Sequence, residues 1–562
     1  MSIKSIFANH KYKSVILYFS QPLQRNIGDV SDNKISRLFY IVISLFLFSF
    51  FLTLLVSLCF FNNSTFTLNT IGQLLMALTF FVILFVFYKT FSALRTLCIH
   101  SKLPFNSALL IAFLSLFIIQ LHLVTNISTS IGWDVGVIFN TAVAESPLYS
   151  YYIGSFPNNL LLFFVIKFLI YVFRLIGLTD YWLGLSVVNV MLVDIALFAS
   201  IITIKKFERG YENMLIFFFI ISSFLIGLSP WVIVPYSDTF SMPVVSLFVL
   251  FCILAAQAKN KSKQLFFVVI AGVLFAIGWL LKSTIIAVVP ALLIVLFLYL
   301  LQIRKDIIWH RIIAVLLVGI VSVVSSFGAF NLYVRNQKLI TYDETMRTPM
   351  SYTIATGIVI VNFDNQPEVQ LERTTGYGCW NYDVANLNHG TTQEKNDRFY
   401  PFIKEKLQEH GVLGYMKFLF NKARWITSEG NFFWLSEGGP ADFSNPHGNF
   451  LRDLFYNNGK YYTFYIHAVN GLWIVVFFGL VLGMFFPLFK RFREEINGFN
   501  YGLFIRLSAF FIIFLLLFTE GRSRYLLSFL PLFCIVSASG YSQFIRIIRA
   551  INLTESEKEK NV

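Results

Sequence analysis

Charged residues are scarce in this sequence. Of its 562 residues, 13% are charged and 57% are hydrophobic, whereas soluble domains carry about 25% charged residues. So few charges exclude a soluble enzyme, a disordered chain and a collagen-like fibre. A polytopic membrane protein remains, because only contact with lipid makes so much apolar surface stable. The 65 phenylalanines indicate apolar helices that are rich in Phe rather than in Ala or Gly.

Cysteine is sparse as well, and nucleotide-binding fingerprints are missing. The five cysteines have no CxxC spacing, so neither a disulfide framework nor a zinc site follows. No GxGxxG or GxxxxGK[ST] motif occurs in a suitable context. A cleavable signal peptide is not expected, because the first apolar run begins near Leu38 and is too long.

The formal net charge is +14. In a soluble protein this excess would suggest a nucleic-acid partner. In a membrane protein it has a simpler source, because cytoplasmic loops concentrate Lys and Arg. Nucleic-acid binding is therefore not expected.

Several apolar runs are long enough to span a bilayer, which takes about 18 residues or more. They lie near 38–61, 70–93, 105–125, 157–177, 181–203, 213–230, 241–257, 265–281, 284–301, 312–333, 463–488, 503–519 and 526–547.

The basic residues orient these runs. They cluster in residues 1–37 and in alternate loops, which predicts a cytoplasmic N-terminus and a cytoplasmic C-terminus. Residues 126–156 and 334–462 then face outward. An odd number of crossings must separate 126–156 from the basic loop at 205–211, so one of the two runs between them does not fully cross. Twelve crossings are expected.

The predicted fold is an all-α polytopic membrane protein with about 12–13 transmembrane segments and a small mixed α/β extracytoplasmic domain. A helix is expected from Lys395 to Lys422, and Gly376-Tyr377-Gly378 is expected to turn. The predicted units are a cytoplasmic N-terminal segment (1–37), a transmembrane module with its first outer loop (38–333), the extracytoplasmic domain (334–462), C-terminal transmembrane helices (463–547) and a cytoplasmic tail (548–562).

Two acidic residues in outer loops are candidates for chemistry. Asp134 lies in Gly132-Trp133-Asp134-Val135-Gly136, and Asp238 lies in Tyr236-Ser237-Asp238-Thr239 before a helix. Both patterns are also typical of helix capping, most clearly at Asp238.

Three cations stand at the predicted outer ends of spans, where basic residues run against the topology rule. These are Lys282, Arg522 and Arg524. They could bind a lipid phosphate, which Arg holds in bidentate fashion. They could instead snorkel, or pair with Glu520.

The order of these motifs resembles that of the GT-C glycosyltransferases. Asp134, the Tyr-rich approach to Pro157-Asn158-Asn159, Tyr236-Ser237-Asp238, Leu281-Lys282-Ser283-Thr284 and Glu520-Gly521-Arg522-Ser523-Arg524-Tyr525 follow one another as in that superfamily. Its members use polyprenyl-phosphate sugars, as protein O-mannosyltransferases and the lipid A aminoarabinose transferase do. Lys422-Ala423-Arg424-Trp425 and Glu429-Gly430-Asn431-Phe432-Phe433-Trp434 look most similar to uncharacterised GT-C-like integral membrane proteins of Gram-positive bacteria. The mannosyltransferases carry a paired Asp-Glu where this chain has Asp134-Val135, a departure that concerns substrate class more than fold.

The resemblance implies a glycosyltransferase of the bacterial cell membrane. Its donor would be a polyprenyl-phosphate sugar. Its acceptor would be an extracytoplasmic lipid, a protein, or a glycan such as a cell-wall polymer. Asp134 would be the general base and Asp238 would orient the sugar or acceptor. Lys282, Arg522 and Arg524 would bind the donor phosphate. Tyr151, Tyr152, Asn158, Tyr236 and Tyr525 are the candidates for contact with sugar or acceptor.

No cofactor is required by the sequence. Asp134 and Asp238 could share a divalent metal, although no dense acidic cluster demands one. Two other functions stay open. A transporter or flippase would use Lys167, Arg174 and Asp194 as intramembrane sites. A polysaccharide polymerase or ligase would use outer-loop arginines.

Overall fold

The computed structural model describes residues 34–60, 70–100, 105–131, 133–144, 149–207, 211–302, 309–362, 375–434, 449–456, 459–489 and 499–559. Most of the predicted N-terminal segment, residues 1–33, and the last three residues of the tail lie outside this range.

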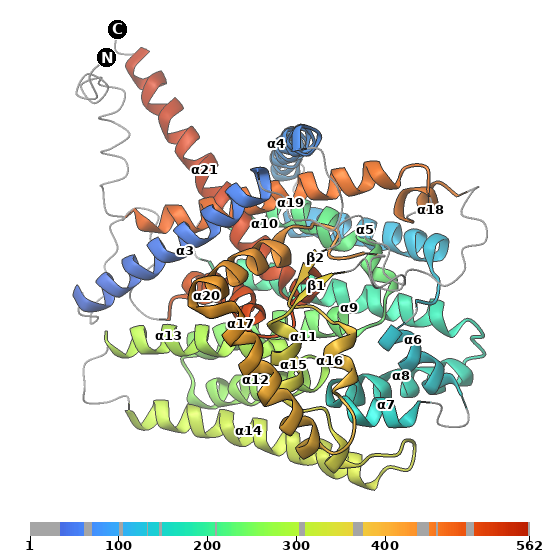
Figure 1. Ribbon diagram of the computed structural model, residues 1–562. Coiled ribbons are helices and arrows are strands. Elements are labelled where there is room, and N and C mark those ends of the chain that lie inside the picture. The colour runs from blue at the N-terminus through green and yellow to red at the C-terminus, as the bar shows by residue number, and fades with distance from the viewer. Residues whose placement is uncertain are drawn as a thin grey trace.

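The described chain is a helical bundle, which confirms the all-α membrane architecture (Figure 1). Twelve helices are long and apolar enough to cross a bilayer. They are α3 (Lys34–Phe60), α4 (Thr70–His100), α5 (Phe105–Ile127), α8 (Pro157–Leu175), α9 (Tyr181–Ile204), α11 (Ser237–Gln257), α12 (Lys261–Leu281), η3 with α13 (Ser283–Ala287, Val288–Leu300), α14 (Trp309–Asn336), α19 with η6 (Tyr462–Phe485, Phe486–Leu488), α20 (Tyr501–Phe518) and η7 with α21 (Ser523–Phe529, Leu530–Glu559).

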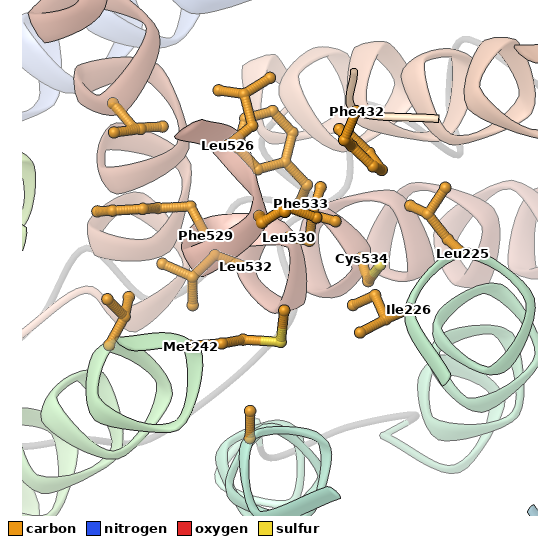
Figure 2. Close-up of a cluster of buried hydrophobic side chains, with 14 of the residues drawn as sticks. Leu225, Ile226, Met242, Phe432, Leu526, Phe529, Leu530, Leu532, Phe533 and Cys534 are labelled. Atoms are coloured by element: carbon orange, nitrogen blue, oxygen red, sulfur yellow. The ribbon is translucent and has the colours of Figure 1, made fainter. Parts of the chain in front are cut away.

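The core of the bundle lies around α11 and α21. Figure 2 shows Met242 of α11, Phe533 of α21 and Leu225 of the π-helix η1 (Ser223–Gly227) gathered in one cluster with Phe432. All four side chains are buried. By contrast, α14 leaves most of its apolar side chains exposed. Lipid can solvate such a surface, so α14 lies at the periphery of the bundle.

Helices α5 and α9 are antiparallel neighbours along their whole length. Their contacts join Ser128 Oγ to Ser186 Oγ (3.4 Å), Gln120 Nε2 to Asp194 Oδ1 (3.1 Å) and Lys205 Nζ to Asn106 Oδ1 (3.0 Å). Helix α9 therefore begins on the side of the membrane where α5 ends. We call this the outer side, as predicted from the distribution of Lys and Arg.

It follows that α8 does not cross the membrane. The chain leaves α5 and enters α9 on the same side, so the described residues between these two helices stay on that side. Phe168, Tyr171 and Leu175 lie exposed at i, i+3 and i+7 on one face of α8, while the opposite face is buried. Such a helix is suited to lie along the bilayer surface. Its length and apolar content alone are those of a span.

A shorter helix takes the place of α8 in the count. Helix α10 (Tyr211–Ser222) continues into η1, which together give 17 residues. The inner end of α10 is fixed by Asn213, which accepts a hydrogen bond from Tyr88 of α4 (3.1 Å). The chain then reaches the 3-10 helix η2 (Pro230–Ile233), whose carbonyls accept from Ser186 and Asn189 near the outer end of α9. Helix α10 with η1 therefore takes the place of α8, and the number of candidate crossings among the described residues stays at twelve.

Short elements on the outer side surround these ends. The first outer loop contains α6 (Trp133–Val143) and α7 (Ser150–Ser155). The large outer segment contains η4 (Glu344–Met346), α15 (Met350–Gly357), β1 (Ile360–Asn362), β2 (Thr375–Tyr377), α16 (Tyr382–Asn386), α17 (Thr392–Thr427) and α18 (Phe450–Phe455). Strands β1 and β2 pair antiparallel, with Val361 opposite Gly376.

The predicted helix at 395–422 is α17, which extends beyond both predicted ends. A capping box between Thr391 and Glu394 starts it, and Gly411, with φ 58°, kinks it. The predicted turn at Gly376-Tyr377-Gly378 is wrong in part. Gly376 and Tyr377 belong to β2, because they pair with β1, and only Gly378 takes a left-handed conformation (φ 65°).

The placement of α8 can be tested by labelling the short connection to α9. Thr179→Cys should react with a membrane-impermeant thiol reagent from the same side as Asp383→Cys in the outer segment. Lys261→Cys, at the first residue of α12, should stay protected in sealed cells. Protein of natural sequence, treated with the same reagent, gives the labelling background from the five native cysteines. Protection of Thr179→Cys together with labelling of Asp383→Cys would mean that α8 crosses.

Candidate functional site

Four distant parts of the chain meet at the outer ends of α11, α12 and α21. Asp134 lies in the first turn of α6, and Tyr236 immediately precedes α11. Lys282 is the C-cap of α12, and Arg524 lies in η7. Each of these polar groups thus stands at or next to a helix end on the outer side. Contacts between the side chains join them into one cluster.

Asp134 is held by two tyrosines. The hydroxyl of Tyr236 donates to Asp134 Oδ2 (2.7 Å), and the hydroxyl of Tyr152 donates to Asp134 Oδ1. Burial and the nearby Asp134 carboxylate raise the pKa of both tyrosines, so both hydroxyls keep their protons and serve as donors. The N-terminal position in α6 also favours a negative charge. Asp134 is therefore an oriented carboxylate that accepts hydrogen bonds.

Asp238 is fully buried and pairs with two cations. Lys282 Nζ contacts its Oδ1, and Arg524 Nε lies 3.4 Å from its Oδ2. A buried charge is tolerated when it is paired, and removing one partner is costly. Asp238 thus holds the two cations in place beside it.

Tyr525 links this ion cluster to Glu520. Its ring lies under Lys282 Nζ (4.1 Å) and Arg524 (5.4 Å), and its hydroxyl donates to Glu520 Oε1 (2.8 Å). Arg524 also stacks over the ring of Tyr236 (5.3 Å), the tyrosine that holds Asp134. One continuous network therefore runs from Asp134 to Glu520.

Burial tunes two titratable groups of this network. It lowers the pKa of Lys282 to about 8, although Asp238 opposes the shift. It raises the pKa of the Glu520 carboxyl. Both shifts have the same cause, because a poorly solvated site disfavours the charged form of each group.

Arg522 is buried beside an unusual turn. Its guanidinium lies 5.2 Å from the ring of Phe433. Phe432 and Phe433 both have positive φ (54° and 64°), which costs a non-glycine residue about 1–3 kcal/mol. Trp231 helps to hold the turn by donating to the carbonyl of Asn431 (3.0 Å). The turn thus places an aromatic face against Arg522.

The loop that carries Glu520 and Arg522 is fastened to the outer segment. Lys422 of α17 is fully buried and donates to the carbonyls of Gly357 (2.6 Å) and Thr519 (2.5 Å). The amides of Glu520 and Gly521 donate to the carbonyls of Thr353 and Gly378, each at 2.8 Å. Only glycine fits at position 378, because a Cβ there would collide with the side chain of Lys422. The outer segment therefore positions this loop.

Some predicted candidates lie outside this network. Tyr151 is exposed and has no recorded side-chain contact with Asp134 among the described residues. Asn158 donates to Asn159 (3.0 Å) and has no recorded contact with the network among the described residues. Conversely, Glu520 and Lys422 were not predicted to belong to the site. Both stand in the sequence motifs that carry the resemblance, but only the fold brings them together.

The three residues of the transporter hypothesis do not form one site, because Asp194 has a different partner from Lys167 and Arg174. Lys167 donates to the carbonyls of Ala142 and Ala144 (2.8 and 3.1 Å), and Arg174 donates to that of Val143 (2.8 Å). Both cations thus satisfy the C-terminal end of α6, where a positive charge is favourable. Asp194 instead accepts from Gln120 between α5 and α9.

A metal site is not evident in the described part of the chain, where no three His, Cys, Asp or Glu side chains group together. The acidic side chains of the network have tyrosine hydroxyls and cations as their recorded partners.

Comparisons with known proteins place the chain in a family. A family model described as "conserved hypothetical integral membrane protein" matches residues 28–544. The chain belongs to this family. The matched residues include every member of the network described above, together with Lys422 and the Phe432-Phe433 turn.

A comparison with curated proteins finds no match. Among solved structures, the chain is similar to ArnT from Cupriavidus metallidurans in the apo state, with 11% identity, 78% of each chain covered and a TM-score of 0.31. A similarity this low says nothing about the chemistry of this chain.

The fastening of the outer segment gives a stability prediction. Lys422→Ala leaves the carbonyls of Gly357 and Thr519 without this donor, and the loss costs about 1–3 kcal/mol for a buried group such as the Gly357 carbonyl. The unfolding temperature of the purified protein in detergent should fall clearly. Lys417→Ala, on the exposed side of the same helix, should leave it unchanged. Equal unfolding temperatures for the two variants would contradict the structural role of Lys422.

Proposed function

We propose that this protein is a membrane glycosyltransferase that moves a sugar from a polyprenyl-phosphate donor to an acceptor on the outer side of the cell membrane. The observation that carries the proposal is the joining of Asp134 to the Lys282–Asp238–Arg524 ion cluster through Tyr236. A base and a set of cations thus stand together at the level where spans end. A lipid-linked donor and an aqueous acceptor meet at that level.

Asp134 is proposed as the general base. Transfer requires that a group take the proton from the acceptor hydroxyl as this oxygen attacks the sugar. Asp134 has its carboxylate fixed by Tyr152 and Tyr236, so it would be oriented before the acceptor arrives. Such preorganisation lowers the cost of reaching the reactive geometry.

Lys282, Arg522 and Arg524 are proposed to bind the donor phosphate. Negative charge develops on the leaving phosphate as the glycosidic bond breaks, and fixed cations stabilise it. Beside these three cations the site holds three acids, namely Asp134, Asp238 and Glu520. When Glu520 keeps a proton, as its raised pKa favours, one positive charge is in excess. The site would then attract an anionic lipid headgroup.

The aromatic side chains would contact the sugar or the acceptor. Tyr152, Tyr236 and Tyr525 already lie in the network, and their ring faces suit a sugar. Tyr151 is exposed next to them, so it is suited to an acceptor arriving from the aqueous side. Asn158 remains a weaker candidate, since its amide already donates to Asn159.

The proposed orientation has both ends of the chain in the cytoplasm and the network outside, in line with the basic loops. The domain organisation changes in one respect from the predicted one. The outer segment 334–462 is treated as part of the catalytic unit, because Lys422 and Gly378 hold the loop at 519–521.

The base can be tested with Asp134→Asn, which keeps the size of the side chain and removes its basicity. Transfer from a radiolabelled polyprenyl phosphohexose or phosphopentose to membrane acceptors should fall by about 10²-fold or more. Asp397→Asn, an exposed acid in the outer segment, should transfer normally. Both variants must accumulate in the membrane to the natural level. Normal transfer by Asp134→Asn would end the assignment.

The phosphate site can be tested through the pH dependence of donor binding. Lys282 carries its charge below its pKa of about 8 and loses it above. Binding of a polyprenyl phosphomannose, whose phosphodiester keeps one negative charge throughout, should weaken as the pH rises through 8. In Lys282→Arg the guanidinium stays charged, so this loss should disappear. The same decline in both proteins would show that another group causes it.

A further inference from the structure

The second half of α17, after the kink at Gly411, has a large exposed apolar face. Val412 is 83% exposed, Leu413 85%, Met416 62% and Phe420 46%. The spacing of these residues places them on one side of the helix. We call this face the 412–420 face. A protein surface in water rarely keeps four adjacent large apolar side chains exposed unless they contact a partner.

The 412–420 face is not the side of α17 that packs on the protein. Phe418, Lys422, Trp425 and Ile426 form the opposite side and are all buried. Phe418 packs against Tyr377 of β2 (6.1 Å), and Lys422 donates to the outer end of α20. The helix is therefore held on one side, while its other side is left for a different environment.

The position of this half-helix identifies the environment. Arg424 Nε donates to Ser57 Oγ (2.6 Å), three residues before the end of α3, and Lys422 donates to Thr519, which directly follows α20. The half-helix thus passes the outer ends of two spans.

The apolar surface continues from these spans onto α17. Val56 and Phe60 at the outer end of α3 are 42% and 61% exposed, and Phe518 at the outer end of α20 is 40% exposed. On membrane-spanning helices such side chains face lipid. The guanidinium of Arg424 lies 5.8 Å from the ring of Phe420. The same guanidinium donates the hydrogen bond to Ser57 of α3. The exposed side of α17 is thus adjacent to lipid-facing helix ends.

The charges beside this face fit lipid headgroups. Lys417 is exposed at the edge of the face, and Arg424 lies one helical turn beyond Phe420. Interfacial helices combine a buried apolar face with Lys and Arg at headgroup level, where these side chains meet lipid phosphates.

We propose that the 412–420 face of α17 inserts into the outer leaflet of the bilayer and holds the large outer segment against the membrane surface. The apolar side chains replace water contact with contact to acyl chains, and Lys417 reaches the phosphates. This inference rests on the placement of α17 alone and is independent of the proposed glycosyl transfer.

The test places a fluorescent reporter on the face. Leu413→Cys of the full-length protein is labelled with an environment-sensitive NBD group and reconstituted into phosphatidylcholine–phosphatidylglycerol vesicles. Glu405→Cys, exposed on the first half of the same helix, is the matched control. Labelled protein of natural sequence supplies the background from the native cysteines. Met416→Cys serves as a second reporter on the same face.

Two quenchers distinguish the outcomes. A nitroxide attached to the upper part of the lipid acyl chain should quench the label at 413 and 416 several-fold more than at 405, and aqueous iodide should do the reverse. Equal quenching of all three sites by iodide, without quenching by the lipid nitroxide, would overturn the proposal. So would protection from both quenchers that is lost when the protein is diluted in lipid, because it would mean that a second copy covers the face.

Discussion

The arrangement of the outer side depends on the burial of Asp238. A carboxylate with no exposed surface requires cationic partners, and Lys282 and Arg524 supply them from two other helix ends. Because these partners come from α12 and η7, the ion pairs fix the relative positions of α11, α12 and α21 where they leave the bilayer. The tyrosines that pack on the same cations extend this order to Asp134 and Glu520.

Much of the membrane architecture and several of the clustered residues could be predicted from the sequence. Apolar runs report burial in lipid directly, and Asp134, Asp238, Lys282 and Arg524 stand out because charge is rare near spans. The cluster itself could not be predicted. Its members are up to hundreds of residues apart, and only tertiary packing brings Tyr236 between Asp134 and Arg524.

Helix α8 illustrates where hydropathy fails. Its 19 residues have the length and apolar content of a span, because an interfacial helix and a spanning helix both need apolar side chains. The distinguishing information lies in the pairing of α5 with α9, which is a contact between distant segments. For α10 the error would be the opposite one, because its α-helical part alone is too short for a span. The helix continues as the π-helix η1 before the chain reaches the outer side.

The fastening at Lys422 also has an evolutionary consequence. The outer segment is interlocked with the bundle through the carbonyls of Thr519 and Gly357 and through the amides of Glu520 and Gly521. It is therefore not a detachable module that can be gained, lost or exchanged between relatives by recombination at 334 and 462. A functional exchange would have to carry the 519–521 loop along with the segment, so the two stretches should be inherited as one unit.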